Sequence, residues 1–312
     1  MKLPKPLPLG LPEHGFTVAA ATSIGVTPAQ LRHPRLARPF HGMRATELPG
    51  DLLAKCHSYA PNVRANEAFS GLTAAVIWGL PTPSRWVAAR HVPELVVPKS
   101  AARARSDGLK PRRILDSRFE RVLHLGLPVV PPLLEFLTSC RDLGPIEATM
   151  MADALLAEAS HYPGLTIDDR PLVTEDELYA ALKTWRRTPG MSVLRQAVER
   201  MRAGVESPME TRLRCKLADA GFDCLEIQPE ITLPDGTRFR ADLGHRESGT
   251  YLDYEGEHHW ADDTTIRADL TRTRLLQSLG LRHIRLTKDD FEPAPWGSLV
   301  AELARRLPRT NS

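Results

Sequence analysis

The alternation of apolar and polar positions is clearest over the last third of the chain. Residues 207–221 predict a helix, because Ser-Pro opens them, apolar residues recur every three or four positions and Gly closes them. Residues 224–233 and 237–243 alternate around a Pro-Asp-Gly turn and predict a hairpin. The elements expected after it are a strand at 250–255, a helix at 262–279, a strand at 281–286 and a helix at 296–307. The order α-β-β-β-α-β-α predicts an α/β domain over residues 203–312, with a mixed sheet flanked by helices.

The N-terminal part of the chain has a different residue pattern. Prolines make residues 1–14 an extended tail. A short apolar segment at 16–21 is followed by Gly25 and by Thr27-Pro28, which is typical of a helix start and opens a second helix over 28–33. The basic stretch 35–44 alternates enough to form a short hairpin or wing. Residues 15–60 therefore predict a winged helix-turn-helix, whose second helix enters the major groove of DNA; the alternative is a small helical cap without that role.

Residues 61–202 predict a mixed α+β middle region. The expected elements are a buried helix at 68–81, a strand at 92–97, and helices at 145–159, 174–185 and 186–201. Thr174 and Glu177 form a capping-box pattern at one helix start. Residues 99–113 contain six basic residues and one Asp and predict an exposed loop, which either follows a phosphate backbone or is simply solvated.

Length and composition narrow the class of protein. A chain of 312 residues is expected to hold two or three domains, and 42% apolar with 25% charged residues is typical of a globular protein. No apolar run reaches the roughly 18 residues that a membrane span needs, and the proline-rich start does not fit a signal peptide. The four cysteines form no closely spaced pair. We expect a cytoplasmic protein without a membrane partner.

Charge is distributed unevenly. Met1 to Arg202 hold 26 Lys and Arg against 19 Asp and Glu, whereas the rest of the chain holds 15 against 19. A basic front and an acidic back suit a protein that binds a polyanion with one part and a metal ion with the other. The alternative is that these counts reflect ordinary variation in surface charge along the chain.

Three carboxylates of the last third are expected to converge. Asp242 lies on the second predicted strand. Asp253 and Glu255 stand two apart on the third, so that both point to one face. Clustered carboxylates repel one another, and Mg²⁺ or Mn²⁺ relieves that repulsion. Pairing of these acids with Arg238 and Arg240 is the alternative. A zinc site built on the histidines of this region is disfavoured, because no cysteine stands at ligand spacing.

These motifs resemble a known family. Glu210 on a helix, Arg-Ala-Asp ending at Asp242, the segment Leu-Asp-Tyr-Glu-Gly-Glu-His-His at 252–259 and the later strand at 281–286 look like the PD-(D/E)XK nuclease superfamily. They are more similar to its uncharacterised bacterial branch related to the very-short-patch-repair endonuclease (Vsr-like). More weakly, residues 25–27 and 38–44, with 69–81 as a following landmark, resemble the N-terminal winged helix of AbiE-type antitoxins.

The resemblance implies a restriction-endonuclease-like fold and metal-dependent hydrolysis of DNA. It implies that Asp242, Glu255 and Asp253 hold the cation, that Glu210 completes the site and that His258 or His259 acts as general acid or base. The superfamily often has a lysine two residues after its second acid; residues 253–259 contain none, and the paired histidines are the candidate replacement. The candidate DNA contacts of the front are Arg35, Arg38, Arg44, Arg103, Arg105, Lys110, Arg112 and Arg113.

Three hypotheses remain open from the sequence. The leading one is a DNA-binding endonuclease. The second is a catalytically silent DNA-binding regulator or antitoxin-like module on the same fold, in which the acids serve as structural pairs. The third is an enzyme of other chemistry whose front helices bind a protein partner. Double-strand cleavage would suit a homodimer, whereas nicking would suit a monomer.

Overall fold

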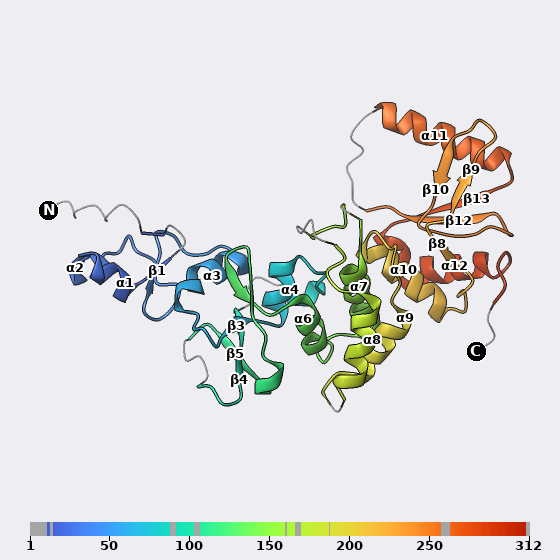
Figure 1. Ribbon diagram of the computed structural model, residues 1–312. Coiled ribbons are helices and arrows are strands. Elements are labelled where there is room, and N and C mark those ends of the chain that lie inside the picture. Colours follow the sequence, from blue (N-terminus) through green and yellow to red (C-terminus); the bar gives the residue numbers. More distant parts are fainter. Residues whose placement is uncertain are drawn as a thin grey trace. The chain divides into compact units, whose positions relative to one another are not determined.

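The computed structural model describes residues 11–12, 15–87, 92–102, 107–159, 161–165, 170–186, 188–256 and 263–309 (Figure 1). The chain forms two compact units, each built from two separate segments. Unit 1 comprises residues 1–144 and 164–195, and unit 2 comprises residues 145–163 and 196–312. None of the helices in the described ranges is long and apolar enough to cross a membrane.

The start of unit 1 partly matches the predicted winged helix-turn-helix. Helix α1 (Val18–Ser23) and helix α2 (Pro28–Leu31) are joined through Gly25, and the Thr27 hydroxyl caps α2 as its sequence predicts. The basic stretch 35–44 is not a hairpin of its own. Its strand β2 (Met43–Arg44) pairs instead with β1 (Phe16–Thr17), and Ala37 and Ala45 form an isolated bridge.

The rest of unit 1 is built around a five-stranded mixed sheet of order β5-β4-β3-β7-β6. Its strands are β3 (Ala68–Phe69), β4 (Glu94–Pro98), β5 (Lys110–Ile114), β6 (Val122–His124) and β7 (Leu127–Val129). Its helices are α3 (Leu52–Tyr59), α4 (Leu72–Trp78), α5 (Ser84–Val87), α6 (Pro132–Ser139) and α8 (Glu175–Thr184), and α9 (Met191–Arg200) runs on into unit 2. The predicted Thr174–Glu177 capping box of α8 is confirmed.

Strand β5 corrects an expectation, because its residues were expected to lie in an exposed loop. Lys110 to Ile114 pair in parallel with Glu94 to Pro98. β5 lies at one edge of the sheet, and an edge strand tolerates a proline such as Pro111, which has no N–H to donate. A basic, proline-containing segment can therefore be a strand when a long-range partner is available.

Unit 2 is an α/β layer structure. Its four-stranded sheet has the order β13-β12-β11-β8, with β12 and β13 parallel and the other pairs antiparallel. The strands are β8 (Glu226–Ile227), β11 (Leu243–His245), β12 (Thr250–Tyr254) and β13 (Arg282–Leu286). The helices are α7 (Pro145–Leu156), α10 (Pro208–Asp219), α11 (Asp263–Ser278) and α12 (Pro293–Leu303). The three predicted helices and the predicted strands at 250–255 and 281–286 are present, and α7 is added from the middle region.

The predicted hairpin over 224–243 is divided between two sheets. Its inner parts, β9 (Glu230–Thr232) and β10 (Arg238–Arg240), form a separate two-stranded sheet, whereas β8 and β11 belong to the four-stranded sheet. The chain bends at Gln228, whose φ of 47° is left-handed, and Gln228 N donates to Asp242 O at 2.9 Å. The bend places Asp242 between the two sheets.

Apolar side chains cover both faces of the four-stranded sheet. On one face Leu252 and Leu286 pack with Leu213 and Leu217 of α10 and Leu303 of α12. On the other, Tyr251 packs with Phe239 of β10 and Leu276 of α11. Figure 1 shows the sheet between α11 and the pair α10 and α12. The strands thus hold Tyr251 and Leu252 on opposite faces, as their alternation requires.

Candidate functional site

Two aspartates meet where β11 and β12 pair. Leu243 faces Leu252 in the register, so that Asp242 and Asp253 lie opposite each other. Asp242 N donates to Asp253 Oδ1 at 2.9 Å, and Tyr254 N donates to Asp242 Oδ2 at 2.7 Å. The two carboxylates are thus fixed by backbone amides of each other's strand.

Glu210 joins this pair from the first turn of α10. Its side chain is buried, and its Oε2 accepts a hydrogen bond from Glu206 N at 3.0 Å. Burial raises the pKa of Glu210, whereas the hydrogen bonds from Glu206 and from the Ser207 and Gln228 side chains oppose that rise. Glu210 therefore also stabilises the start of the helix.

The surroundings of Asp242 raise the pKa of its carboxyl group. Burial, reinforced by the negative charge of Glu210, raises the pKa of Asp242 to about 7, although the hydrogen bond from Tyr254 N opposes the rise. Asp253 and Glu206 add smaller contributions in the same direction as Glu210. In the part of the chain that the structure describes, no basic side chain contacts Asp242.

The other two acids have basic partners. Asp253 Oδ2 lies 2.7 Å from His283 Nε2 of β13, and Glu255 forms an ion pair with Arg285 of the same strand. The sequence suggested Arg238 and Arg240 as partners, but these pair with Glu230 and Glu206 respectively. Glu210 and Asp253 lie close enough to act on the charge of Asp242, whereas Glu255, which was expected to converge with Asp242 and Asp253, is held by an arginine.

Sequence reasoning missed a second group beside Glu210. Glu206 contacts Arg240 Nη2 at 2.8 Å and His161 Nε2 at 2.9 Å. These partners are 34 and 45 residues away in the chain, and no local pattern marks such contacts. The side chain of Arg240 is 50% exposed to solvent, and that of His161 is 64% exposed.

The hard oxygens of Glu210 and Asp242 fit a divalent cation in part. Within the described ranges no three His, Cys, Asp or Glu side chains are grouped so that they could hold a metal ion. Mg²⁺, however, is commonly held by one or two carboxylates, with water and substrate phosphates as its other ligands. His258 and His259, the expected general acid or base, lie outside the described residues.

The candidate DNA contacts near the N-terminus divide into two kinds. Arg35 and Arg38 are exposed. Arg44 instead donates from Nε to Leu31 O and from Nη1 to Met43 O, both at 2.7 Å, and so holds the end of α2. Helix α2 has four residues, a length of only about 6 Å, which leaves little helix to enter a groove.

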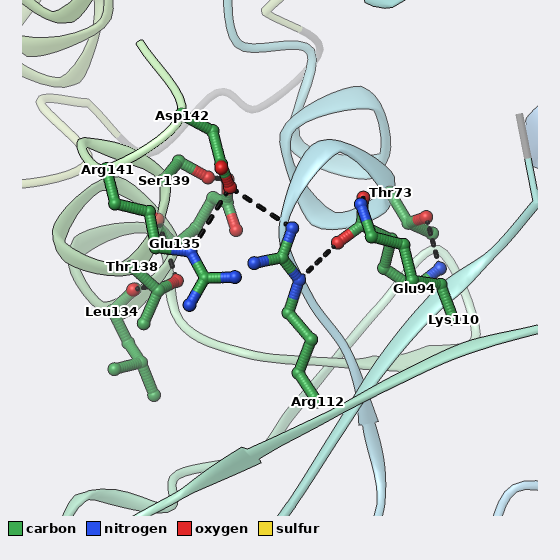
Figure 2. Close-up of polar contacts among 10 residues, drawn as sticks. All are labelled: Thr73, Glu94, Lys110, Arg112, Leu134, Glu135, Thr138, Ser139, Arg141 and Asp142. Carbon is green, nitrogen blue, oxygen red and sulfur yellow. Dashed lines mark hydrogen bonds and ion pairs between the residues drawn. The ribbon is translucent and has the colours of Figure 1, made fainter. Parts of the chain in front are cut away.

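The basic candidates on β5 are partly neutralised. Glu94, a buried acid on β4, lies 2.6 Å from Arg112 Nε and 2.9 Å from Lys110 Nζ, and Arg112 also reaches Asp142 at 3.1 Å (Figure 2). Arg113 is exposed and donates to Ala101 O at 3.2 Å. The remaining candidates, Arg103 and Arg105, lie outside the described residues.

Protein-family models, curated proteins and solved structures give no match to this chain. Function is therefore inferred from its own residues and their geometry.

Proposed function

We propose that this protein binds DNA and hydrolyses its phosphodiester bonds at Asp242 and Glu210 with a divalent cation, on a restriction-endonuclease-like unit 2. The observation that carries the proposal is the placement of these two carboxylates, Glu210 buried and Asp242 half-buried, beside Asp253, with no basic side chain of the described residues on Asp242. Such a grouping of like charges is costly unless a cation offsets it.

In this proposal Asp242 and Glu210 hold the cation, Mg²⁺ or Mn²⁺, and DNA phosphate oxygens and water complete its ligands. The cation would polarise the scissile phosphate and lower the pKa of an attacking water. Asp253 is a positioning residue, because it accepts from Asp242 N and is itself fixed by His283. Arg240 and His161, next to Glu206, would face the DNA backbone.

The order α10, β8, β11, β12, α11, β13, α12, with an antiparallel start and one parallel pair, supports the restriction-endonuclease-like assignment. Glu255 has a different place than the sequence suggested. Its ion pair with Arg285 must open before Glu255 can bind a cation, so it is not one of the two carboxylates that we assign to the metal.

A second candidate function is a DNA-binding regulator without catalytic activity. The pairs Asp253–His283 and Glu255–Arg285 favour it, since they use two of the expected metal ligands as structural partners. Exposed Arg35, Arg38 and Arg113 would then contact DNA phosphates, and the contacts would weaken with salt.

A plasmid-cleavage assay distinguishes the endonuclease from the regulator. The full chain is incubated with supercoiled plasmid in Mg²⁺ or Mn²⁺, and binding of a labelled duplex is followed in the same samples. Asp242→Asn and Glu210→Gln are the test variants. Glu226→Gln is the matched control, because Glu226 is an acid of the same unit that pairs with Arg246 at 2.8 Å on the surface. Metal-dependent cleavage that the test variants lose and the control keeps, with binding retained in all, supports the endonuclease.

Binding without cleavage in either metal would overturn the endonuclease and leave the regulator. Absence of salt-dependent DNA binding would overturn both.

A further inference from the structure

A small hollow of about 60 Å³ opens in unit 1, between the sheet and α6. Its polar lining consists of Ser70, Arg112, Arg113, Thr138 and Arg141. Apolar side chains, among them Val96 and Leu134, form the rest of the wall. The volume is several times the roughly 10–15 Å³ that one water molecule needs, so the hollow accommodates a group of a few atoms. An apolar wall with a few polar groups is typical of small-molecule sites.

The charge around the hollow is positive. Arg112, Arg141 and the neighbouring Lys110 share only two carboxylates, those of Glu94 and Asp142. Arg113 makes its hydrogen bond to a carbonyl oxygen rather than to an acid. Figure 2 shows Arg112 rising between Glu94 on one side and Asp142 on the other, with Arg141 close to Asp142.

A third acid nearby adds no charge at neutral pH. Glu135 of α6 is completely buried, and burial raises its pKa to about 8. Its carboxyl group accepts a short hydrogen bond from Ser139. A neutral Glu135 leaves the excess of guanidinium charge at the hollow in place.

Ser70 is an independent indication of a ligand site at this wall. Its side chain is only 4% exposed, and its Oγ has no hydrogen-bond partner among the described residues. A buried hydroxyl without a partner destabilises a protein, and most buried hydroxyls are bonded. Since Ser70 lines the hollow, a ligand there can supply the partner.

We propose that this hollow binds a small phosphate monoester, with the phosphate group on Arg112, Arg141 and the Ser70 hydroxyl, and an apolar group against Val96 and Leu134. Guanidinium groups donate paired hydrogen bonds to phosphate oxygens. A phosphate monoester carries nearly two negative charges at pH 7. Lys110, Arg112 and Arg141 outnumber Glu94 and Asp142, so the net positive charge at the hollow attracts it. The site lies in unit 1 and is independent of the carboxylates of unit 2.

Isothermal titration calorimetry of the full chain with phenyl phosphate tests the proposal, with inorganic phosphate and benzoate as comparison probes at constant ionic strength. Phenyl phosphate is expected to bind more tightly than either probe, because it alone offers both the doubly charged group and the apolar body. Ser70→Ala and Arg141→Gln should each weaken its binding about tenfold, as the loss of one hydrogen bond to a charged group does. Arg121→Gln is the control, since Arg121 is an exposed arginine of the same unit whose hydrogen bond, among the described residues, goes to Ala65 O.

The ligand-free melting temperature separates binding from folding. Ser70→Ala should melt at the same temperature as the wild type or higher, because the hydroxyl that it removes has no partner there. The proposal is overturned if phenyl phosphate does not bind at millimolar concentration, if benzoate binds as tightly, or if neither substitution weakens binding. A lower ligand-free melting temperature of Ser70→Ala would also overturn it, because it would assign the hydroxyl a structural partner.

Discussion

His283 Nε2 lies 2.7 Å from Asp253 Oδ2, although the two residues stand on different strands. In the parallel register of β12 and β13, His283 is opposite Tyr251, so the contact runs diagonally across the pair. The imidazole is 6% exposed and meets the ring of Phe239 edge-on at 5.1 Å. Asp253 is therefore locked in place by both neighbouring strands, since its other oxygen accepts from Asp242 N.

Replacement of His283 by alanine should destabilise unit 2. His283→Ala leaves a partly buried carboxylate without its partner and removes the aromatic contact, and we expect the free energy of unfolding to fall by about 2 kcal/mol. Urea denaturation monitored by circular dichroism measures the change. His41→Ala at an exposed position is the control, with an expected change of about 0.5 kcal/mol or less. Equal effects of the two substitutions would contradict a structural role for the Asp253–His283 pair.

Mg²⁺ should stabilise the folded protein through Asp242. A ligand that binds only the folded state stabilises it by about 1.4 kcal/mol when its concentration is about tenfold above the dissociation constant. We therefore expect the wild type to melt several degrees higher in Mg²⁺ than in EDTA, and Asp242→Asn to show no such difference.

Differential scanning calorimetry at pH 8 measures both proteins, and Glu226→Gln should respond to Mg²⁺ as the wild type does. A Mg²⁺ response that survives Asp242→Asn would place the cation elsewhere.

Glu135 should make stability depend on pH. Its pKa is about 8 in the folded protein and is ordinarily 4.5. Between these values the folded state keeps a proton that the unfolded state has released, so stability falls as pH rises from about 4.5 to 8. Below pH 4.5 both states are protonated, and the cost is absent. The ceiling of the effect is about 5 kcal/mol.

Urea denaturation of Glu135→Gln at several pH values tests this, because glutamine cannot ionise. Its stability should vary less than that of the wild type over the window, whereas Glu175→Gln on the exposed first turn of α8 should keep the wild-type profile. An unchanged profile in Glu135→Gln would refute the assignment of the proton to this residue.

Adjacent arginines on β5 should respond differently to truncation. Arg112 lies 2.6 Å from the buried Glu94, so Arg112→Ala leaves that carboxylate with Lys110 alone and should cost about 3 kcal/mol of folding free energy. Arg113 is exposed, and Arg113→Ala should change stability by about 0.5 kcal/mol or less. Chemical denaturation compares the two variants. Similar losses of unfolding free energy would show that the Glu94–Arg112 pair contributes no more to stability than the exposed Arg113 does.

Local signals in the sequence predicted the helix starts well. Thr174 with Glu177, and Ser207 with Pro208, cap α8 and α10 where their patterns place them. Strand β5 was missed because its proline and arginines favour a loop locally, and only pairing with β4 makes them a strand. A helix cap depends on residues three apart, whereas a strand depends on a partner that the local pattern does not show.

The sequence likewise predicted only part of the candidate site. The approach of Asp242 and Asp253 follows from strand pairing, which the alternating pattern indicates. The partner of Glu255 does not, because Arg285 is 30 residues away and on a strand whose neighbour the sequence left open. Likewise, nothing near Glu206 in the sequence points to His161.

The division of each unit into two chain segments has a consequence for synthesis. Helix α7 belongs to unit 2 but is made before residues 164–195, which complete unit 1. Buried Asp153 of α7 bonds Arg214 Nη2 at 2.7 Å and Thr211 Oγ1 at 2.8 Å, and both partners emerge from the ribosome later still. Domains that occupy continuous segments can fold one after another as they are made. Here the first unit must wait for a segment that lies beyond α7, and α7 must wait for α10, so the order of folding differs from the order of translation.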